Sequence, residues 1–155
     1  MRISVLAVGT KMPKWVEQGV GEYLKRLPPE IKLEIKEISL GKRGKGADIQ
    51  RAISQEGQQM IAAIPDRDHV VALEVKGKPW TTEQLAEQLQ GWQLQGDNIS
   101  LLVGGPDGLA QECRQRASQQ WSLSPLTLPH PVVRIVLAEQ LYRAWTINHH
   151  HPYHR

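Results

Sequence analysis

The sequence predicts an α/β fold in which a mostly parallel sheet carries helices on both faces. Segments with strand-like apolar runs alternate with segments of helical periodicity along the whole chain. One run, 99–103, is apolar almost throughout, which is typical of a strand covered on both faces. Ligands of such folds bind beyond the carboxyl ends of the central strands. Functional residues are therefore expected in the turns that follow the strands.

The first half of the chain is expected to contain two strands and two helices. A β-branched run at 3–8 predicts a strand, and a helical pattern at 13–27 follows it. Apolar and charged residues alternate over 31–36, as in a half-solvated strand near a sheet edge. The stretch 39–48 is rich in glycine and cations and predicts a loop, and apolar residues recur at helical spacing over 49–64.

The second half continues the alternation. A third strand is expected at 69–75, and a turn at 77–79 leads into a helix. Thr81 and Gln84 fit a capping box at the start of that helix, and Gly96 ends it.

The strand at 99–103 should lie at the centre of the sheet. A polar helix near 110–120 follows it, then the segment 123–128, which shows no strand-like alternation. A helical stripe of apolar residues covers 131–145, and the polar residues 148–155 are not expected in the core.

Size and composition bound the class of protein. With 155 residues, of which 40% are hydrophobic, the chain is expected to form one domain over 1–155. Its single cysteine, Cys113, excludes an internal disulfide and a cysteine-based zinc site, and fits a reducing compartment. No stretch approaches the roughly 18 apolar residues that a membrane span requires. A soluble cytoplasmic protein without a membrane partner is therefore expected.

Charge is distributed unevenly along the chain, although the net charge is only +3. Lys and Arg outnumber Asp and Glu by 11 to 6 over 1–51 and by 5 to 2 over 109–155, whereas acidic residues prevail by 8 to 3 between them. Such asymmetry indicates surfaces that face a polyanion, although a solvated protein shows some of it by chance.

A basic loop offers the best candidates for contact with RNA. A loop spaced by glycines adapts to phosphates, and each contact adds salt dependence rather than sequence choice. An ordinary solvated surface loop is the alternative. The candidate RNA-binding residues are Lys42, Arg43 and Lys45, with Arg51 beyond them.

The glycine-rich turn 104–108 follows the strand that is predicted to be most buried. Its glycines let the backbone approach a flat or anionic ligand and expose amide groups to it. A nucleotide hydrolase that uses this turn has little support, because the Lys of a phosphate-binding loop and the set of acidic metal ligands that such chemistry needs are missing. Taken alone, the turn fits a tight strand-to-helix connection slightly better than a ligand site.

The segment 123–128 favours a ligand site over a simple strand-to-helix connection. Pro125 and Pro129 hold the backbone extended, so that apolar side chains and free backbone groups could sandwich an adenine ring and bond its edge. The alternative is a buried loop, but without a ligand or ordered partners such a loop leaves backbone polar groups unpaired.

Five stretches of the sequence are more specific than these patterns. They are VLAVGTKMPKWV, GKRGKGADI, LLVGGPDGL, WSLSPLTLPHPVVRIVLAEQLYRAWTI and the terminal HPYHR. Together they resemble the SPOUT methyltransferases, and most closely those that methylate N3 of a pseudouridine in large-subunit ribosomal RNA. The resemblance covers essentially the whole chain.

The resemblance implies a trefoil knot in the C-terminal part of the domain and S-adenosylmethionine bound among the loops of the knot. General topology rules exclude knots, and nothing in the periodicity reveals one here. The cofactor-binding residues that the resemblance implies are Leu73, Gly104, Leu123, Ser124, Pro125, Leu126, Thr127 and Leu128.

The resemblance also implies a homodimer that acts on the assembled ribosome, with the C-terminal tail near the partner's cofactor pocket. Transfer to a ring nitrogen benefits from a base, or from cationic and hydrogen-bonding groups that favour the deprotonated ring, and requires no metal. The predicted catalytic residues are therefore Tyr153, His154 and Arg155, and a frayed tail is the alternative. Second candidates are His130, Arg134, Glu139 and Arg143, of which the last two can equally form a helix-stabilising ion pair.

Four of the six histidines, His149, His150, His151 and His154, invite a metal site. A consecutive triple points its side chains in diverging directions, and no nearby Cys or carboxylate completes a ligand shell, so no metal is expected. The main alternative to a methyltransferase is a non-catalytic RNA-binding or ribosome-associated factor of the same fold.

Overall fold

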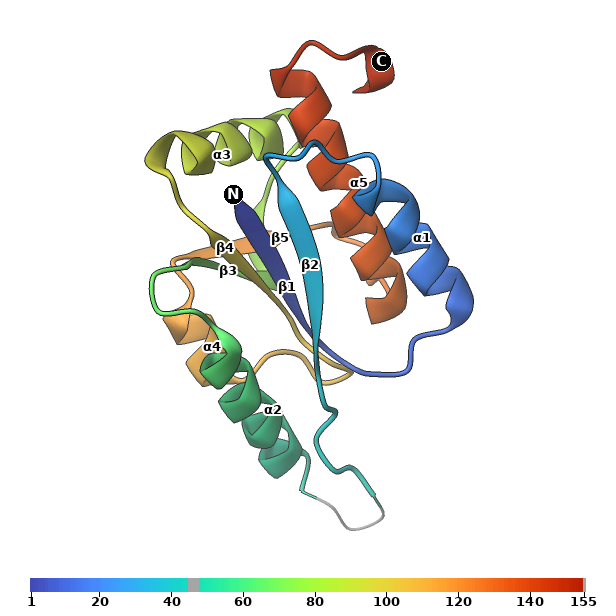
Figure 1. The fold of residues 1–155 in the computed structure, drawn as a ribbon. Helices are drawn as coiled ribbons and strands as arrows, with labels where there is room; N and C mark the ends of the chain where they lie inside the picture. The colour runs from blue at the N-terminus through green and yellow to red at the C-terminus, as the bar shows by residue number, and fades with distance from the viewer. Residues whose placement is uncertain (45–47, 155) are drawn as a thin grey trace.

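The computed structural model describes residues 1–44 and 48–154, and its centre is a five-stranded parallel sheet (Figure 1). The strands are β1 (Arg2–Val8), β2 (Lys32–Ile38), β3 (His69–Pro79), β4 (Ile99–Val103) and β5 (Gln119–Ser122). The helices are α1 (Lys14–Leu24), α2 (Ile49–Ala63), α3 (Thr82–Gln95), α4 (Gln111–Arg116) and α5 (His130–Asn148), followed by the short 3-10 helix η1 (Pro152–His154).

The order of the strands, β2-β1-β4-β3-β5, confirms two predictions. β4 lies at the centre, pairs with β1 and β3, and is buried along its whole length, as its continuous apolar run predicts. β2 lies at one edge, where its alternating charged residues can face solvent.

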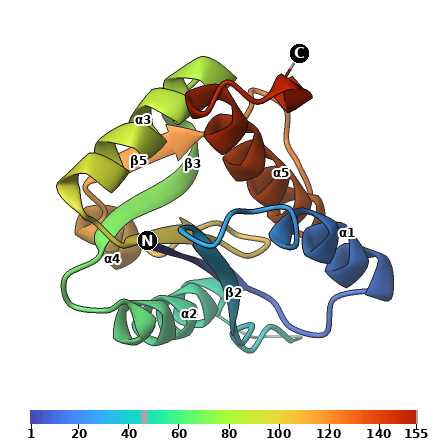
Figure 2. The same ribbon diagram turned by 45° about the horizontal axis from the view of Figure 1, so that its top comes forward.

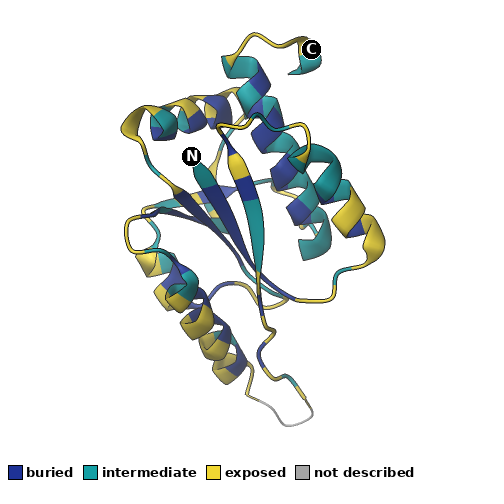
Figure 3. Cartoon of the chain, viewed as in Figure 1, coloured by how far each residue is buried: buried dark blue, intermediate teal, exposed yellow. Residues whose placement is uncertain are grey.

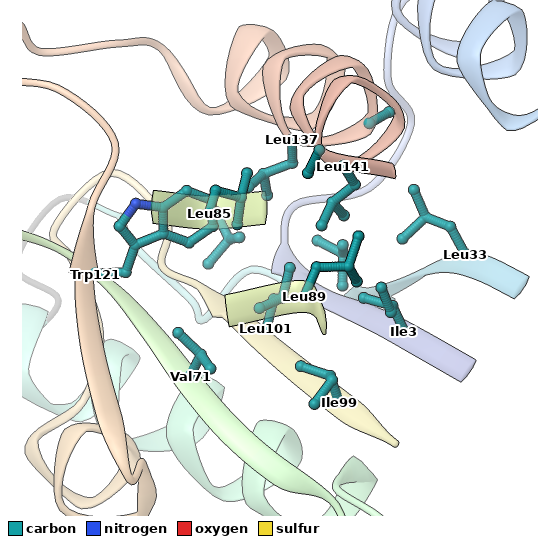
Figure 4. Close-up of a cluster of buried hydrophobic side chains, with 14 of the residues drawn as sticks. Ile3, Leu33, Val71, Leu85, Leu89, Ile99, Leu101, Trp121, Leu137 and Leu141 are labelled. Atoms are coloured by element: carbon teal, nitrogen blue, oxygen red, sulfur yellow. The ribbon is translucent and has the colours of Figure 1, made fainter. Parts of the chain in front are cut away.

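Helices cover both faces of the sheet and close two hydrophobic cores (Figure 2). Helices α1, α3 and α5 cover one face, where Leu89 and Leu137 pack over Leu101 (Figure 4). Helices α2 and α4 cover the other face, over Leu6 and Leu102. Helices α1, α2 and α3 bury the side that faces the sheet and expose the other side, whereas every residue of α5 is buried or half-buried (Figure 3). The prediction of a parallel sheet covered on both faces is confirmed.

The helix ends follow the local signals in the sequence. Thr81 and Gln84 form the predicted capping box at the start of α3, because each side chain accepts a hydrogen bond from the other residue's backbone N–H. Gly96 ends the helix with a φ of +72°, a conformation that favours glycine.

Two predictions about the last strands are wrong. β3 does not turn at 77–79 but continues to Pro79, with a shift in its pairing to β5 between Leu73 and Lys78. The polar helix ends at Arg116, and the residues expected at its end form β5 instead. A four-residue edge strand that begins with two glutamines is too short and too polar to show a period of two.

None of the helices within 1–44 and 48–154 combines the length and the apolar character needed to cross a lipid bilayer.

Candidate cofactor-binding site

A cavity of about 420 Å³ lies at the carboxyl end of β4, beside the middle of β3. Its size falls within the roughly 300–1,000 Å³ that small-molecule sites occupy. Three segments form its walls: the middle of β3, just beyond its pairing with β4, the turn after β4, and the segment that leads from β5 into α5. Pro125 lies in the last segment but is exposed and does not line the cavity. The other predicted cofactor-binding residues do line it: Leu73, Gly104, Leu123, Ser124, Leu126, Thr127 and Leu128.

The path of the chain explains why these segments meet. β5 lies at one edge of the sheet, whereas α5 begins beside the end of β1, where a Cβ on Gly9 would come within 3.2 Å of the His130 ring. Residues 123–129 must therefore cross over the middle of β3 and the end of β4. The Ser124 hydroxyl accepts a hydrogen bond of 2.9 Å from the Leu126 N–H and stabilises a turn within the crossing segment.

Glycine is required sterically in the turn after β4. A Cβ on Gly104 would lie 2.6 Å from the carbonyl carbon of Gly108, so even alanine would displace the turn. Gly108 has a φ of +85°, which favours glycine, and its N–H donates to the Gly105 carbonyl at 3.1 Å. The tight turn forms one wall of the cavity through its backbone.

Two polar atoms of the cavity lining have no hydrogen-bond partner among the described residues. They are Glu74 Oε1 and His130 Nδ1, and both are buried. The Arg114 guanidinium lies 3.7 Å from Glu74 Oε1, which is too far for a hydrogen bond. Burial, with the nearby Arg134 charge, lowers the pKa of His130, so its imidazole is neutral at neutral pH. Apolar walls with an acceptor carboxylate and a neutral imidazole suit a ligand that combines a flat ring with hydroxyl or ammonium groups.

Glu74 was not among the residues predicted from the sequence. It follows Leu73 directly and lies near the end of the strand predicted at 69–75, which is a signal that the sequence offers. Its Oε1 is buried and has no hydrogen-bond partner among the described residues, which only the structure shows.

Arg134, one of the four second candidates for catalysis, forms hydrogen bonds that connect elements of the fold. Its buried guanidinium donates to Glu37 Oε2 at 2.7 Å and to the Gly9 carbonyl at 2.8 Å. These bonds join α5 to the ends of β1 and β2, and Arg134 does not line the cavity.

The predicted catalytic tail lies at the opposite end of α5 from the cavity of its own chain (Figure 1). The helix has 19 residues, which corresponds to about 28 Å at 1.5 Å per residue. The tail folds back along α5 as far as Glu139, which accepts a hydrogen bond from the Tyr153 hydroxyl, but neither Tyr153 nor His154 lines this cavity. Arg155 lies outside the described residues.

Tyr153 is held against α5 by a polar cluster. Its hydroxyl donates to Glu139 Oε2 at 2.9 Å, and the Arg143 guanidinium donates to the same oxygen at 2.7 and 3.0 Å. The guanidinium carbon also lies 4.9 Å from the centre of the Tyr153 ring. Burial and the hydrogen bond to Glu139 raise the pKa of Tyr153 to about 12. The hydroxyl is thus protonated at neutral pH and acts as a hydrogen-bond donor.

The neighbouring histidines pack against the helix end. His149 stacks on Trp145 with ring centres 4.7 Å apart, and His151 Nδ1 accepts from the Tyr153 N–H at 3.2 Å. Within 1–44 and 48–154, no group of three His, Cys, Asp or Glu side chains is placed to hold a metal ion.

The structure separates the predicted RNA-binding residues into two kinds. Lys42 and Arg51 are exposed. Arg43 instead forms ion pairs with Glu56 and Asp107, and only 17% of its side chain is exposed. Lys45 lies outside the described residues.

Comparisons with known protein families and sequences give matches over essentially the whole chain. Residues 1–154 match the family model described as "Predicted SPOUT methyltransferase". The chain is 59% identical over 155 residues to a ribosomal RNA large subunit methyltransferase H from Marinomonas sp. (strain MWYL1), with both chains covered completely.

Two solved structures are similar in fold at low sequence identity. A methylase family protein from Haemophilus influenzae Rd KW20 gives a TM-score of 0.56 at 10% identity, over 96% of this chain and 67% of the other. A methylase family protein from Neisseria gonorrhoeae gives 0.55 at 11% identity, over 91% and 80%.

Proposed function

Because the chain belongs to the SPOUT methyltransferase family, we propose that it transfers a methyl group from S-adenosylmethionine to N3 of a pseudouridine in large-subunit ribosomal RNA. The relative with 59% identity over the full length supports methylation of ribosomal RNA. The observation that carries the proposal is the cavity, because seven of the eight residues expected to hold the cofactor line it.

The cavity residues suit the parts of the cofactor. Leu123 and Leu128 offer apolar walls for the adenine, and the backbone of the Gly104 turn offers hydrogen-bonding groups beside it. Glu74 and His130 offer the unpaired polar atoms that hydroxyl or ammonium groups require. When bound, the cofactor supplies a methyl group that is already activated, so the protein mainly aligns it with the ring nitrogen.

We further propose that the active site is completed in a homodimer by the tail of the second copy. The ring nitrogen loses its proton only at alkaline pH, so transfer requires groups that favour the deprotonated ring. In the proposed site, Tyr153 donates a hydrogen bond, His154 accepts the proton or holds the base edge, and Arg155 supplies positive charge. The separation of the tail from the cavity of its own chain supports this division between two copies.

The proposal also includes the binding of ribosomal RNA and a knot in the C-terminal part of the chain. Exposed Lys42 and Arg51 would contact phosphates of RNA in the assembled ribosome. With that substrate, we propose that the reaction takes place in the cytoplasm. The C-terminal trefoil knot that the resemblance implies is part of this proposal, and the meeting of residues 123–128 with the turn after β4 around one cavity supports it.

Calorimetric titration with S-adenosylmethionine tests the cofactor site. We expect saturable binding to the wild-type protein and its loss in Gly104→Val, because the added side chain would displace the turn that lines the cavity. Gly91→Val is the steric control, since nothing lies within 4 Å of a Cβ at that position. Circular dichroism checks that each variant is folded.

The outcomes separate the two candidate functions. Absence of binding to folded wild-type protein would favour a non-catalytic RNA-binding factor. Binding that survives Gly104→Val would place the cofactor elsewhere. Mass-spectrometric mapping of methylated nucleotides in ribosomes from cells that lack the gene then identifies the modified base.

A further inference from the structure

Arg43 joins its own loop to the next helix, α2, and to a turn 64 residues further along the chain. Its Nε donates to Asp107 Oδ2 at 2.8 Å, in the glycine-rich turn of the cavity. Its Nη1 donates to the Gly41 carbonyl at 3.1 Å and to a carboxylate oxygen of Glu56 on α2. The basic loop, α2 and the turn after β4 therefore meet at one guanidinium.

The carboxylate on α2 makes this contact obligatory. The side chain of Glu56 is only 3% exposed, and its Oε2 also accepts a hydrogen bond of 2.8 Å from the Gly41 N–H. Its other oxygen has no partner among the described residues. A buried carboxylate requires a compensating charge, and Arg43 provides it.

The backbone of the basic loop is also held closely. A Cβ on Gly41 would lie 2.3 Å from the Ala52 carbonyl oxygen, so the loop passes directly against α2. A Cβ on Gly105 would lie 3.6 Å from Leu40 Cδ1, so the loop also borders the turn of the cavity. Displacing residues 40–43 would consequently disturb both neighbours.

We propose that Arg43 is a positioning residue that couples the basic loop to the cofactor cavity. This inference rests on the proposed function. Asp107 lies between Pro106 and Gly108, both of which line the cavity, so the ion pair to Arg43 fixes the wall of the cavity relative to the RNA-contacting loop. RNA phosphates that hold the loop then favour the arrangement of the turn that binds the cofactor, and the cofactor favours RNA binding by the same factor.

Asp107→Asn tests the coupling with the least risk to folding. It removes the charge at the cavity turn but leaves Arg43 paired with the buried Glu56, and Asp107 itself does not line the cavity. We expect the Kd for S-adenosylmethionine, measured by calorimetry without RNA, to rise about 3- to 10-fold, which corresponds to roughly 0.7–1.4 kcal/mol. Arg43→Lys, which keeps the charge beside Glu56 but loses the planar fork, should change the Kd in the same direction.

A second measurement distinguishes coupling from simple weakening. The ratio of the cofactor Kd without and with the large ribosomal subunit should exceed one for the wild type and fall towards one for Asp107→Asn. Asp66→Asn is the matched control, because Asp66 is exposed, lies in the turn before β3, and loses the same charge. It should leave the Kd and the ratio unchanged.

The inference and the proposed function fail in different ways. A wild-type protein that binds no cofactor overturns both the proposed function and the coupling. If Asp107→Asn has the same Kd for S-adenosylmethionine as the wild type, and the same ratio of the Kd without and with the ribosomal subunit, the coupling is overturned but the proposed function is not. Amide hydrogen exchange tests the ion pair between Arg43 and Asp107 without any ligand. Exchange should become faster at 104–109 and at 40–43 in Asp107→Asn. Unchanged exchange in both segments would show that the ion pair does not hold them together.

Discussion

Glu139 is the centre of the polar cluster that holds the tail. One carboxylate oxygen accepts from Arg143 and Tyr153, and the other accepts from Gln140 at 2.8 Å. Burial acts to raise the pKa of Glu139, but the hydrogen bonds from Arg143 and Tyr153 outweigh it, and the pKa is lowered from its ordinary value of 4.5. The ionised form is therefore the one that stabilises the folded chain.

Glu139→Gln should reduce stability in a pH-dependent way. A lowered carboxyl pKa contributes stability above the unfolded value of 4.5 and loses it as the pH falls through the folded value. We expect a loss of about 1 kcal/mol at pH 7, small because the cluster is partly solvated, and a shrinking difference from the wild type below pH ~4. Urea unfolding at several pH values measures it.

Glu87→Gln provides the control, because Glu87 is exposed on α3. It should change the free energy of unfolding by less than about 0.5 kcal/mol at each pH. A Glu139→Gln deficit that stays constant between pH 3 and pH 7 would contradict the assignment of the stability to the charged carboxylate.

At the scale of elements, the junction of β3 and β5 depends on one glycine. A Cβ on Gly77 would lie 2.8 Å from the carbonyl carbon of Gln120, so the two strands approach more closely than a side chain allows. Next to this contact, Trp121 of β5 stacks on Trp80 with ring centres 4.9 Å apart. The edge strand is thus attached by backbone proximity and by aromatic packing.

Gly77→Ala should therefore destabilise the protein by roughly 1–3 kcal/mol, because the added methyl group overlaps backbone that cannot move freely. Urea unfolding measures the loss. Gly91→Ala is the matched control: it lies in α3 with nothing within 4 Å of its Cβ, and should increase stability by up to about 1 kcal/mol. Equal effects of the two substitutions would show that the close approach is not limiting.

The same junction shows what the sequence can predict and what it cannot. The continuous apolar run of β4 and the capping box of α3 are local signals, and both elements form where expected. The extension of β3 to Pro79 depends on pairing with β5, which lies about forty residues away and carries no local pattern of its own. Strand pairing between distant segments decides such ends.

In the candidate site, too, some features could be predicted from the local sequence and others could not. The crossing segment and the glycine-rich turn were signalled by their composition and position after strands, and the resemblance then named their residues. The partners of Arg43 could not be predicted from the sequence, because Glu56 and Asp107 lie 13 and 64 residues away from it. The sequence alone therefore predicts that Arg43 contacts phosphate, and only the fold shows that it pairs with the buried carboxylate of Glu56.

At the scale of the whole molecule, α5 connects the two halves of the proposed active site. His130 at its beginning lines the cavity, and Tyr153 lies just beyond its end. Two copies related by a two-fold axis, with their α5 helices antiparallel, would bring each tail to the partner's cavity. In the homodimer that we propose, activity would be a property of the pair and not of the single chain.

Mixed dimers test the shared site. One subunit carries Gly104→Val, which disables its cavity, and the other lacks Tyr153 to Arg155, which removes its tail. Each variant alone should lack methyl transfer, whereas the heterodimer retains one intact cavity facing one intact tail and should recover about half of the wild-type activity. Differently tagged, co-expressed subunits purified in tandem allow methyl transfer to ribosomes to be measured. A tail that acted on its own chain would leave both sites of the heterodimer defective, so an inactive heterodimer that still binds cofactor would contradict the shared site.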